Sequence, residues 1–496
     1  MLQFILNNET IKTNEPQGLT VLDFIRYKKH LMGTKIGCRE GDCGACTILV
    51  GTLENDTVQY CSMTSCLTPL ANVQNKHVVT VEGVNTEGGN LTPIQSAMVE
   101  ESGTQCGFCT VGFVMSMTGH CLQQGYLDET DAIAAIDGNI CRCTGYKSIQ
   151  RAAQRLTNFL EKRDAHGSPL DFAVENHIVP SYFSDIKNRL SALPTFQKFV
   201  PKESLGKTFG KLKDALYVAG GTDLYVQKHD SMTHSPSKAL FNDKILRGVN
   251  LVNGYFEIGG AATVSDMKSS SPMNGEFASL QKYLKLVSST PIRNMATIGG
   301  NLVNASPIGD MTVFLLALNA TITLSDLTTF KKLSNLLGER EIYLKDFYKG
   351  YKNLDKTDGE ILTKIRFKQP FGNYHFNFEK VSKRTHLDIA SVNTAIYLKT
   401  DKDEITEAHV SMGGVAPIPL FLKQLSAFLI GKKIEQGGKI AWFSRGTPLE
   451  EEANAILQAE ISPISDVRGS AAYKRLLARQ LFQAHFIELF SILINP

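Results

Sequence analysis

The chain has 496 residues, of which 43% are hydrophobic and 20% charged, and its formal net charge is only +3. A chain of this length exceeds what one hydrophobic core usually organises, so we expect three or more domains. The small net charge, with Lys and Arg dispersed along the chain, does not indicate a nucleic-acid-binding protein. The longest apolar runs, Met311–Leu318 and Phe486–Ile494, are too short to cross a bilayer. The first residues lack the basic start and apolar run of a signal peptide, so we expect a cytoplasmic protein with reduced thiols.

The N-terminal part predicts a small sheet with one helix and a cysteine-rich loop, typical of a ferredoxin-like β-grasp. A hairpin is expected at Gln3–Leu6 and Thr10–Thr13, turning at Asn7-Asn8. Thr20 can cap a helix over Val21–Tyr27. Three further short strands are expected at Thr47–Val50, Val58–Tyr60 and Val78–Val81.

Eight of the ten cysteines form two tight sets. The first set is Cys38, Cys43 and Cys46, closed by Cys66 or by its competitor Cys61, and the second is Cys106, Cys109, Cys141 and Cys143. The C-x4-C-x2-C opening of the first set is the plant-type ferredoxin spacing for a 2Fe–2S cluster. Glycines in that loop leave room for backbone N–H groups to approach the sulfides. Two such clusters in one chain indicate electron transfer.

Disulfide bonds and structural zinc are two other uses of cysteines. Disulfide frameworks belong mostly to short, secreted, cysteine-dense chains, and this chain is neither short nor cysteine-dense. Structural zinc is the stronger alternative, above all for the second set, because four cysteines can hold zinc tetrahedrally. The tenth cysteine, Cys121, is predicted to lie mid-helix as a buried thiol.

The second cysteine set lies in a helical region, which predicts a four-helix bundle with the cluster at one end. Helices are expected from Thr92-Pro93 through Glu100 and over Cys109–Gln123, Thr130–Ile136 and Ser148–Lys162. Both cysteine pairs then precede helices, whose free N–H groups suit an anionic cluster. Residues 163–198 lack clear periodicity and are predicted to be a connecting segment over the surface.

Two glycine-bearing turns further along the chain have the chemistry of a pyrophosphate-binding loop. The first, around Gly220-Gly221, follows a short predicted strand, and the second contains Gly299-Gly300. Paired glycines expose consecutive backbone N–H groups, and Thr or Asn side chains add donors. Asp310 could accept a hydrogen bond from a sugar or ribityl hydroxyl. Neither segment is a Rossmann fingerprint or a P-loop, and a Gly-Gly turn alone is often only a turn.

Taken together, these motifs resemble the iron–sulfur and flavin portion of the xanthine dehydrogenase family of molybdenum hydroxylases, over essentially the whole chain. The resemblance rests on Cys38-Arg-Glu-Gly-Asp-Cys43-Gly-Ala-Cys46, Ser65-Cys66-Leu67-Thr68-Pro69, Gln105-Cys106-Gly107-Phe108-Cys109-Thr110, Gly138 to Tyr146, and Ile298-Gly299-Gly300-Asn301 through Asp310.

The resemblance implies an α+β multidomain fold. Its expected parts are a plant-type 2Fe–2S ferredoxin domain (1–84), a helical-bundle 2Fe–2S domain (85–164), a linker (165–195), an FAD-binding domain of the vanillyl-alcohol-oxidase type (196–372) and a C-terminal domain of the CO-dehydrogenase flavoprotein type (373–496).

The resemblance also implies site residues. It favours Cys66 over Cys61 as the fourth ligand of the first cluster. The FAD contacts that it implies are Tyr217, Val218, Ala219, Gly220, Gly221, Thr222, Asp223, Leu224, Thr297, Ile298, Gly299, Gly300, Asn301, Asp310, Leu362 and Lys380. Asp223 and Tyr351 would lie near NAD+, and Gln105 would face a molybdopterin on the partner, its alternative being an ordinary polar helix cap.

Two departures from the family pattern concern Thr110-Val111-Gly112, where Thr-Pro-Gly is usual, and Leu387, which stands where mammalian members have an acidic residue. The chain ends at Pro496 without the family's large molybdenum domain, after a helix expected from Ser470 onward. It is therefore expected to pair with a molybdenum-cofactor-binding large subunit, as a heterotetramer of two small and two large chains.

The expected activity is electron transfer from molybdenum through two 2Fe–2S clusters to FAD and on to NAD+, in purine oxidation. Catalysis on this chain would be flavin-mediated, with no side-chain acid or base of its own. The alternatives are the same relay in a hydroxylase acting on an aldehyde or N-heterocycle, and a stand-alone electron-transfer flavoprotein.

Overall fold

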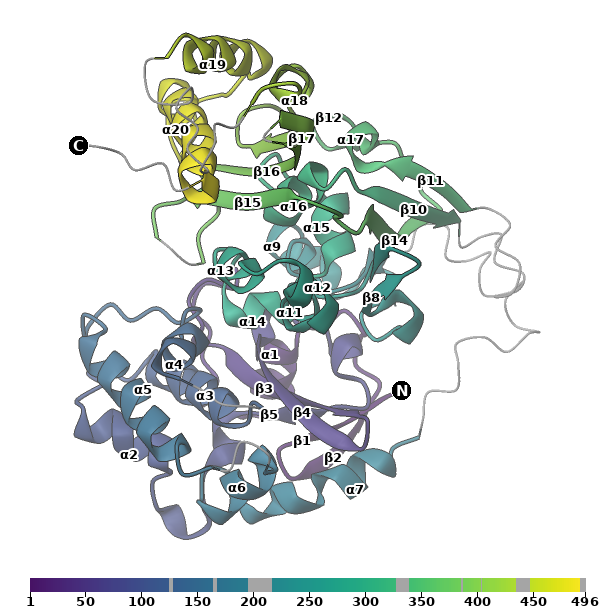
Figure 1. Cartoon of the computed structure of the whole chain (residues 1–496). Helices are drawn as coiled ribbons and strands as arrows, with labels where there is room; N and C mark the ends of the chain where they lie inside the picture. Colours follow the sequence, from purple (N-terminus) through teal and green to yellow (C-terminus); the bar gives the residue numbers. More distant parts are fainter. Residues whose placement is uncertain are drawn as a thin grey trace. The chain divides into compact units, whose positions relative to one another are not determined.

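The computed structural model describes residues 1–124, 128–163, 167–194, 216–326, 339–384, 387–402, 404–433 and 447–490. They fall into two units, each described by itself (Figure 1). The first unit comprises Met1–Asn242 and Ser289–Ala296, and the second comprises Asp243–Ser288 and Thr297–Pro496. Residue 196, where we expected the flavin-binding domain to begin, lies outside the described residues. The bounds of the five predicted segments stay predictions.

A five-stranded sheet in the order β2-β1-β5-β3-β4 forms the beginning of the first unit. Its strands are β1 (Leu2–Leu6), β2 (Glu9–Thr13), β3 (Thr47–Glu54), β4 (Thr57–Thr64) and β5 (His77–Val79). The predicted hairpin is confirmed, because β1 and β2 pair antiparallel. The strands β1 and β5 pair parallel, so the sheet is mixed. The Thr20 side chain accepts a hydrogen bond from the Asp23 amide at the start of α1 (Val21–Asp23), as predicted, and the chain continues as a π-turn, η1 (Phe24–Lys28). This mixed sheet with one helical turn is the expected β-grasp.

Two short 3-10 turns lie between β4 and β5, and two further turns and four α-helices follow β5. The turns are η2 (Ser65–Leu67), η3 (Leu70–Val73), η4 (Val81–Val84) and η5 (Glu87–Gly89), and the helices are α2 (Pro93–Glu100), α3 (Thr110–Cys121), α4 (Glu129–Ala135) and α5 (Lys147–Leu160). Thr92 and Gln95 form a reciprocal capping box at the start of α2, which confirms that helix start. Phe113, Ile149 and Leu156 share one buried core. Cys121 is buried, as predicted, but it is the last residue of α3 rather than a mid-helix one.

Residues 163–198, predicted to be a connecting segment over the surface without clear periodicity, contain short helices in their described part. These are α6 (Pro169–Glu175), the 3-10 turn η6 (Ser181–Asp185) and α7 (Ile186–Ser191). Ser168 caps α6 with Pro169 at its first position, which is a local signal for a helix start. Phe183 and Ile186 are fully buried, because they pack into the cores of the preceding domains. These elements are too short to show helical periodicity.

The remaining elements of the first unit pack against the β-grasp core. They are β6 (Leu216–Val218), α9 (Leu224–Gln227), α10 (His229–Met232), β7 (Ser237–Ala239) and α14 (Thr290–Arg293). Val218, Tyr225, Met232 and Met295 belong to the same buried cluster as Phe4 and Cys66. The chain around the first glycine turn is therefore anchored on the ferredoxin-like part.

The second unit contains a five-stranded sheet in the order β11-β10-β14-β9-β8. Its elements are η8 (Lys244–Leu246), β8 (Val249–Val252), β9 (Tyr255–Gly259), α11 (Val264–Ser269), α12 (Ser271–Glu276), α13 (Leu280–Lys285), α15 (Ile298–Asn304), α16 (Asp310–Ala317), β10 (Thr321–Asp326), β11 (Glu339–Tyr343), α17 (Leu344–Phe347), β12 (Tyr348–Gly350), β13 (Asn353–Leu354) and β14 (Glu360–Lys368). α16 is buried almost throughout, which explains its apolar sequence without a membrane.

A second sheet in the order β15-β16-β17-β18 follows, with α18, α19 and α20 gathered beside it in the green-to-yellow part of the chain (Figure 1). Its elements are β15 (Tyr374–Val381), β16 (Val392–Asp401), β17 (Glu404–Gly413), β18 (Leu420–Phe421), α18 (Lys423–Leu429), α19 (Pro448–Glu460) and α20 (Ala471–Phe490). Ser470 accepts from the Tyr473 amide, which confirms the predicted start of the last helix. Across the described ranges, no helix combines the length and the apolar character needed to cross a membrane.

Candidate functional site

The structure arranges the first cysteine set as two pairs of sulfurs. Cys38 pairs with Cys43, and Cys46 pairs with Cys66. The hydrogen bond from the Cys43 thiol lowers the pKa of Cys38 to about 5, and the one from Cys66 lowers the pKa of the buried Cys46. The thiolate is the form that binds metal, and the hydrogen bond within each pair favours that form at one of its two sulfurs.

Backbone N–H groups surround these sulfurs, as the glycines of the loop predicted. The Glu40 amide donates to the Cys38 sulfur at 3.3 Å, and the Gly41 amide donates to Cys66. Gly41 and Gly44 have φ angles of +81° and +67°, in the left-handed region that glycine adopts without strain. The loop therefore offers both the thiolates and the amide donors that a negatively charged iron–sulfur centre needs.

Cys61 and Cys66 differ in what their sulfurs face. Cys61 lies in β4, and its thiol donates to the Val50 carbonyl of the neighbouring strand at 3.7 Å. Cys66 lies in η2, with its sulfur on Cys46. The geometry therefore groups Cys66, and not Cys61, with the other three sulfurs.

The second cysteine set also consists of two pairs. The sulfurs of Cys106 and Cys143 are 3.7 Å apart, and Cys109 faces Cys141. Cys109 directly precedes α3, one residue before the predicted helix becomes regular, and Cys141 and Cys143 lie in the loop before α5, so both cysteine pairs precede helices as predicted. Burial by itself raises the pKa of Cys141, but hydrogen bonds from the Thr144 hydroxyl and amide outweigh it and lower that pKa.

This pairwise arrangement fits a two-iron cluster better than a zinc ion. In a 2Fe–2S cluster four thiolates are shared between two irons, whereas zinc gathers all four around one point. The donor set therefore fits two 2Fe–2S clusters, and the assignment of individual ligands stays a prediction.

The second cluster region lies at the protein surface. Cys106 and Cys143 are exposed, and so are Phe108 and Tyr146 beside them. Gln105 is also exposed, in a bend before α3. It caps no helix, because Cys109 occupies the cap position, so the alternative of an ordinary helix cap was wrong.

The first glycine turn lies in the first unit, between β6 and α9. Gly221 has a φ angle of +85°, and a Cβ atom there would lie 3.3 Å from the carbonyl oxygen of Leu67. A Cβ atom on Gly220 would lie 2.0 Å from the Met295 carbonyl oxygen. The glycines thus let the turn pack directly beside the Cys66 segment. Among the described residues, the N–H groups of Gly220, Gly221 and Thr222 have no protein acceptor.

The second glycine turn lies in the second unit, and its glycines have a different role from the predicted one. The Gly299 N–H donates to the Gly260 carbonyl at 3.0 Å, and the Gly300 N–H donates to the Thr297 hydroxyl at 3.1 Å. A Cβ atom on Gly299 would lie 2.5 Å from the Gly260 oxygen. Glycine is therefore needed here for close packing of α15, and neither N–H is free for a phosphate. The expectation that both N–H groups are exposed was wrong, because Gly260, from a distant loop, and the nearby Thr297 accept them. Gly299 and Gly300 as contacts of FAD stay predictions.

Asp310 and Lys380 form a buried ion pair in the second unit. The Lys380 ammonium lies 2.7 Å from Asp310 Oδ2, and their side chains are 1% and 13% exposed. Asn393 donates to Asp310 Oδ1 at 2.6 Å. Both carboxylate oxygens therefore already have donors, and Lys380 is not the solvated lysine that a lone lysine usually is.

The other predicted contacts are separated between the units. Leu362 is buried in β14, and Tyr351 is 66% exposed, both in the second unit. Asp223, the cap residue of α9, lies in the first unit. The assignment of Asp223 and Tyr351 to NAD+ stays a prediction.

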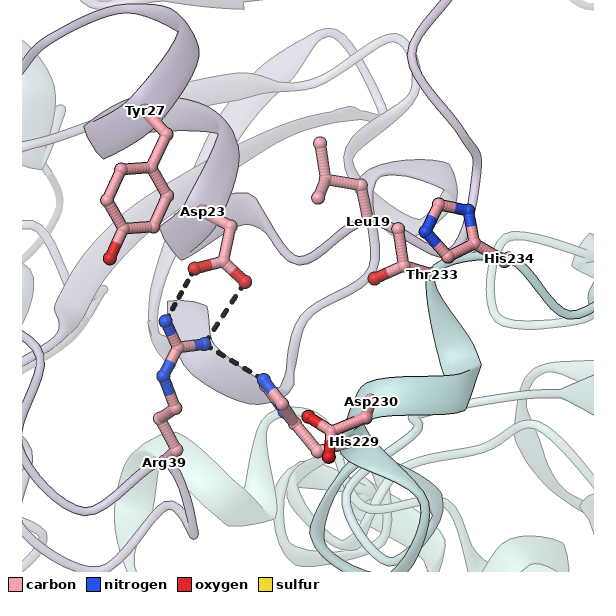
Figure 2. A pocket seen from close by; sticks show the side chains of 8 residues that line it. All are labelled: Leu19, Asp23, Tyr27, Arg39, His229, Asp230, Thr233 and His234. Carbon is pink, nitrogen blue, oxygen red and sulfur yellow. Dashed lines mark hydrogen bonds and ion pairs between the residues drawn. The ribbon is translucent and has the colours of Figure 1, made fainter.

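A polar pocket of about 550 Å³ opens beside the first cysteine loop (Figure 2). It is lined by Leu19, Asp23, Tyr27, Arg39, His229, Asp230, Thr233 and His234. Arg39 donates to the two Asp23 oxygens at 2.7 and 3.1 Å and contacts His229 Nε2 at 2.9 Å (Figure 2). Burial alone raises the pKa of Asp23, but hydrogen bonds from Arg39 and Thr20 outweigh it and hold that pKa below its usual range. Arg39, directly after Cys38, thus ties the cysteine loop to α1 and α10, a role without a local sequence signal.

Four domain-family models match the chain in succession. They are a 2Fe-2S iron-sulfur cluster binding domain over residues 4–71, a [2Fe-2S] binding domain over 80–154, an FAD binding domain in molybdopterin dehydrogenase over 202–369 and a CO dehydrogenase flavoprotein C-terminal domain over 378–489. The chain belongs to the molybdenum hydroxylase family. This molybdenum hydroxylase chain therefore has two 2Fe–2S binding domains and an FAD-binding domain, in the predicted order, and the predicted fold class is confirmed.

Similar proteins agree with this membership. The xanthine dehydrogenase of Emericella nidulans is 29% identical over 548 residues, which cover 99% of this chain and 39% of that protein. The xanthine dehydrogenase of Oryza sativa subsp. japonica is 28% identical over 85% of this chain and 36% of that protein. The chain thus spans about two fifths or less of the length of these relatives. A carbon monoxide dehydrogenase chain from Hydrogenophaga pseudoflava shares the fold over 60% of this chain and 98% of its own, with 22% identity and a TM-score of 0.50.

Proposed function

We propose that this chain is the iron–sulfur and flavin subunit of a xanthine dehydrogenase. The observation that carries the proposal is the arrangement of the first unit, where both cysteine sets form two sulfur pairs and the first glycine turn packs on the Cys66 segment. When bound, the two clusters would pass single electrons and FAD would collect them in pairs for a two-electron acceptor such as NAD+.

The chain's own residues would hold these groups and tune them. The four thiolates of Cys38, Cys43, Cys46 and Cys66 would hold one cluster, and the amides of the glycine-containing loop would stabilise its negative charge. Cys106, Cys109, Cys141 and Cys143 would hold the other cluster. The free N–H groups of the first glycine turn would bind the pyrophosphate of FAD.

The electron source would be a molybdenum centre on a partner chain, in a heterotetramer of two small and two large subunits. The exposed surface around Cys106 and Cys143 supports this proposal, since a one-electron donor must approach a cluster closely. Gln105, exposed beside Cys106, would face the molybdopterin of the partner. Xanthine as substrate is supported by the names of the relatives, which are xanthine dehydrogenases. NAD+ as the acceptor is part of the proposal.

Purification of the tagged chain from its own cells, without a chelator, tests the proposal. We expect a second chain that contains molybdenum to co-purify, and the whole complex to contain FAD and iron. We also expect the complex to reduce NAD+ when xanthine is added. The separated chain should reduce a dye with NADH but should not oxidise xanthine. Turnover of an aldehyde or an N-heterocycle instead of xanthine would favour another hydroxylase, and a chain without any molybdenum partner would favour a stand-alone electron-transfer flavoprotein.

A further inference from the structure

A buried asparagine contacts the first glycine turn from the ferredoxin-like part of the chain. Asn72 lies in η3, a few residues after Cys66, and is only 3% exposed. Its side-chain Nδ2 donates to the carbonyl oxygens of Ala219 at 2.9 Å and of Gly220 at 3.5 Å. Two successive carbonyl groups of the turn therefore face the same side-chain amide.

The direction of these carbonyls decides the direction of the adjacent N–H groups. Across a trans peptide bond, the C=O of one residue and the N–H of the next point in opposite directions. When the carbonyls of Ala219 and Gly220 face Asn72, the N–H groups of Gly220 and Gly221 face away from it. Consecutive N–H groups on one side of a turn make an anion-binding concavity. Asn72 is the side chain that orients this pair of donors.

The surroundings hold Asn72 in this orientation. The side chain of Asn242 donates to the backbone carbonyl of Asn72 at 3.2 Å, and the backbone N–H of Asn72 donates to the Pro69 carbonyl at 2.9 Å. A flipped side chain would place Oδ1 against two carbonyl oxygens, which is repulsive, so the turn also selects the amide orientation. Asn72 Oδ1 is buried and accepts from no donor in the described part of the chain. Buried polar atoms usually have hydrogen-bond partners. The unpaired Oδ1 therefore indicates that the side chain is held in place by the hydrogen bonds of Nδ2 and not by a donor to Oδ1.

We propose that Asn72 is a positioning residue for FAD, which aims the Gly220 and Gly221 amides at the pyrophosphate and connects the Cys66 segment to the flavin turn. The proposal rests on the proposed function, because it takes FAD as the ligand of this turn. Asn72 itself touches neither the reacting atoms nor, through its Nδ2, the phosphate. It acts through the peptide groups of the turn.

The test compares Asn72→Asp with a matched variant in the same unit. Asn72→Asp keeps the size of the side chain but replaces two donated hydrogen bonds by repulsion between a carboxylate and two carbonyls. Asn139 is similarly buried, and its Nδ2 donates to the Gly44 carbonyl at 3.2 Å, far along the sequence from the flavin turn. Asn139→Asp therefore controls for the loss of any buried asparagine amide.

The measured quantities are the dissociation constant for FAD, from titration of the deflavinated full-length protein by flavin fluorescence, and the iron content with the electron paramagnetic resonance of both clusters. We expect Asn72→Asp to weaken FAD binding by about tenfold, in line with the loss of two neutral hydrogen bonds. Its cluster signals should match the parent, and Asn139→Asp should bind FAD as the parent does. If Asn72→Asp loses its clusters, Asn72→Ser, which adds no charge, is measured in its place with the same expectation of weakened FAD binding.

Three results would overturn the inference, and they are distinguishable. FAD binding at parental affinity in the Asn72 variant, with intact clusters, refutes the positioning role alone. A parent chain that takes up no FAD refutes the proposed function and this inference with it. Equal weakening in both asparagine variants also counts against it, because the effect would then be general to the unit.

Discussion

Replacing Lys380 by methionine should destabilise the second unit strongly, because it leaves a carboxylate without its cation. Lys380 is 1% exposed, and it donates to both Asp310 Oδ2 at 2.7 Å and the Leu286 carbonyl at 2.8 Å. Removing one partner of a buried ion pair typically costs about 3–5 kcal/mol. Asp310 keeps the hydrogen bond from Asn393 and lies at the start of α16, where the helix dipole returns up to about 1 kcal/mol. We therefore expect a loss of about 2–4 kcal/mol.

Hydrogen exchange measured by mass spectrometry suits this prediction, because it gives local free energies of opening in a chain with several domains. The peptides that cover α16 and β15 should lose protection in Lys380→Met. The double variant Lys380→Met with Asp310→Asn should regain at least about 2 kcal/mol, since the uncompensated charge is gone. Lys282→Met is the control, because the exposed pair of Lys282 and Glu488 should contribute less than about 1 kcal/mol.

A local free energy of opening in α16 and β15 of Lys380→Met within about 0.5 kcal/mol of the parent would refute a stabilising role of the ion pair. Normal stability with a specific loss of FAD would instead indicate that Lys380 acts on the flavin directly. The two readouts thus separate a structural ion pair from a ligand contact.

Three further predictions have equally definite outcomes. By metal analysis, Cys61→Ser should keep all the iron of the parent, whereas Cys66→Ser should lose about half of it. The reason is that four thiolates hold each of the two clusters. Equal iron in both variants would contradict the sulfur pairing. Gly299→Ala should cost about 1–3 kcal/mol in hydrogen exchange of α15, since its Cβ would lie 2.5 Å from the Gly260 oxygen; a neutral result would show that the backbone moves freely there. The hydrogen bond from Arg340 lowers the pKa of Glu360 to about 2, against an ordinary value of 4.5. This contribution to stability is complete above pH 4.5 and is lost as the pH falls towards 2; because Arg340 is 37% exposed, solvent screening limits it to about 1–2 kcal/mol. Glu360→Gln should flatten that part of a pH–stability curve, and an unchanged curve would count against the pair.

Elements with strong local signals were predictable from the sequence. The hairpin of β1 and β2, the capping box of α2 and the cap of α20 occur as predicted, because turn residues and caps act within a few residues of themselves. The helices α6 and α7 were missed, since elements this short show no periodicity and form because Phe183 and Ile186 are buried by other parts of the chain. Tertiary packing overrode the weak local preference there.

The candidate site also has a part that was predictable from the sequence and a part that was not. The grouping of Cys38, Cys43 and Cys46 was predictable, because short spacings limit how far the sulfurs can separate. The spacing left the choice between Cys61 and Cys66 open, since Cys66 is distant in the sequence and its contact with Cys46 depends on the fold. The glycines around Gly299 looked like free donors, and only the fold showed that Gly260 already accepts one of them.

The sequence by itself thus determined the kind of chemistry this chain can support, because ligand type and short-range spacing are local properties of the polymer. The tertiary structure alone decided which backbone donors remain free and which side chains orient them. Asn72 and Ala219 are 147 residues apart in the chain, yet their hydrogen bond is 2.9 Å long. Such a contact depends on the packing of whole elements against one another, which no local pattern of residues records.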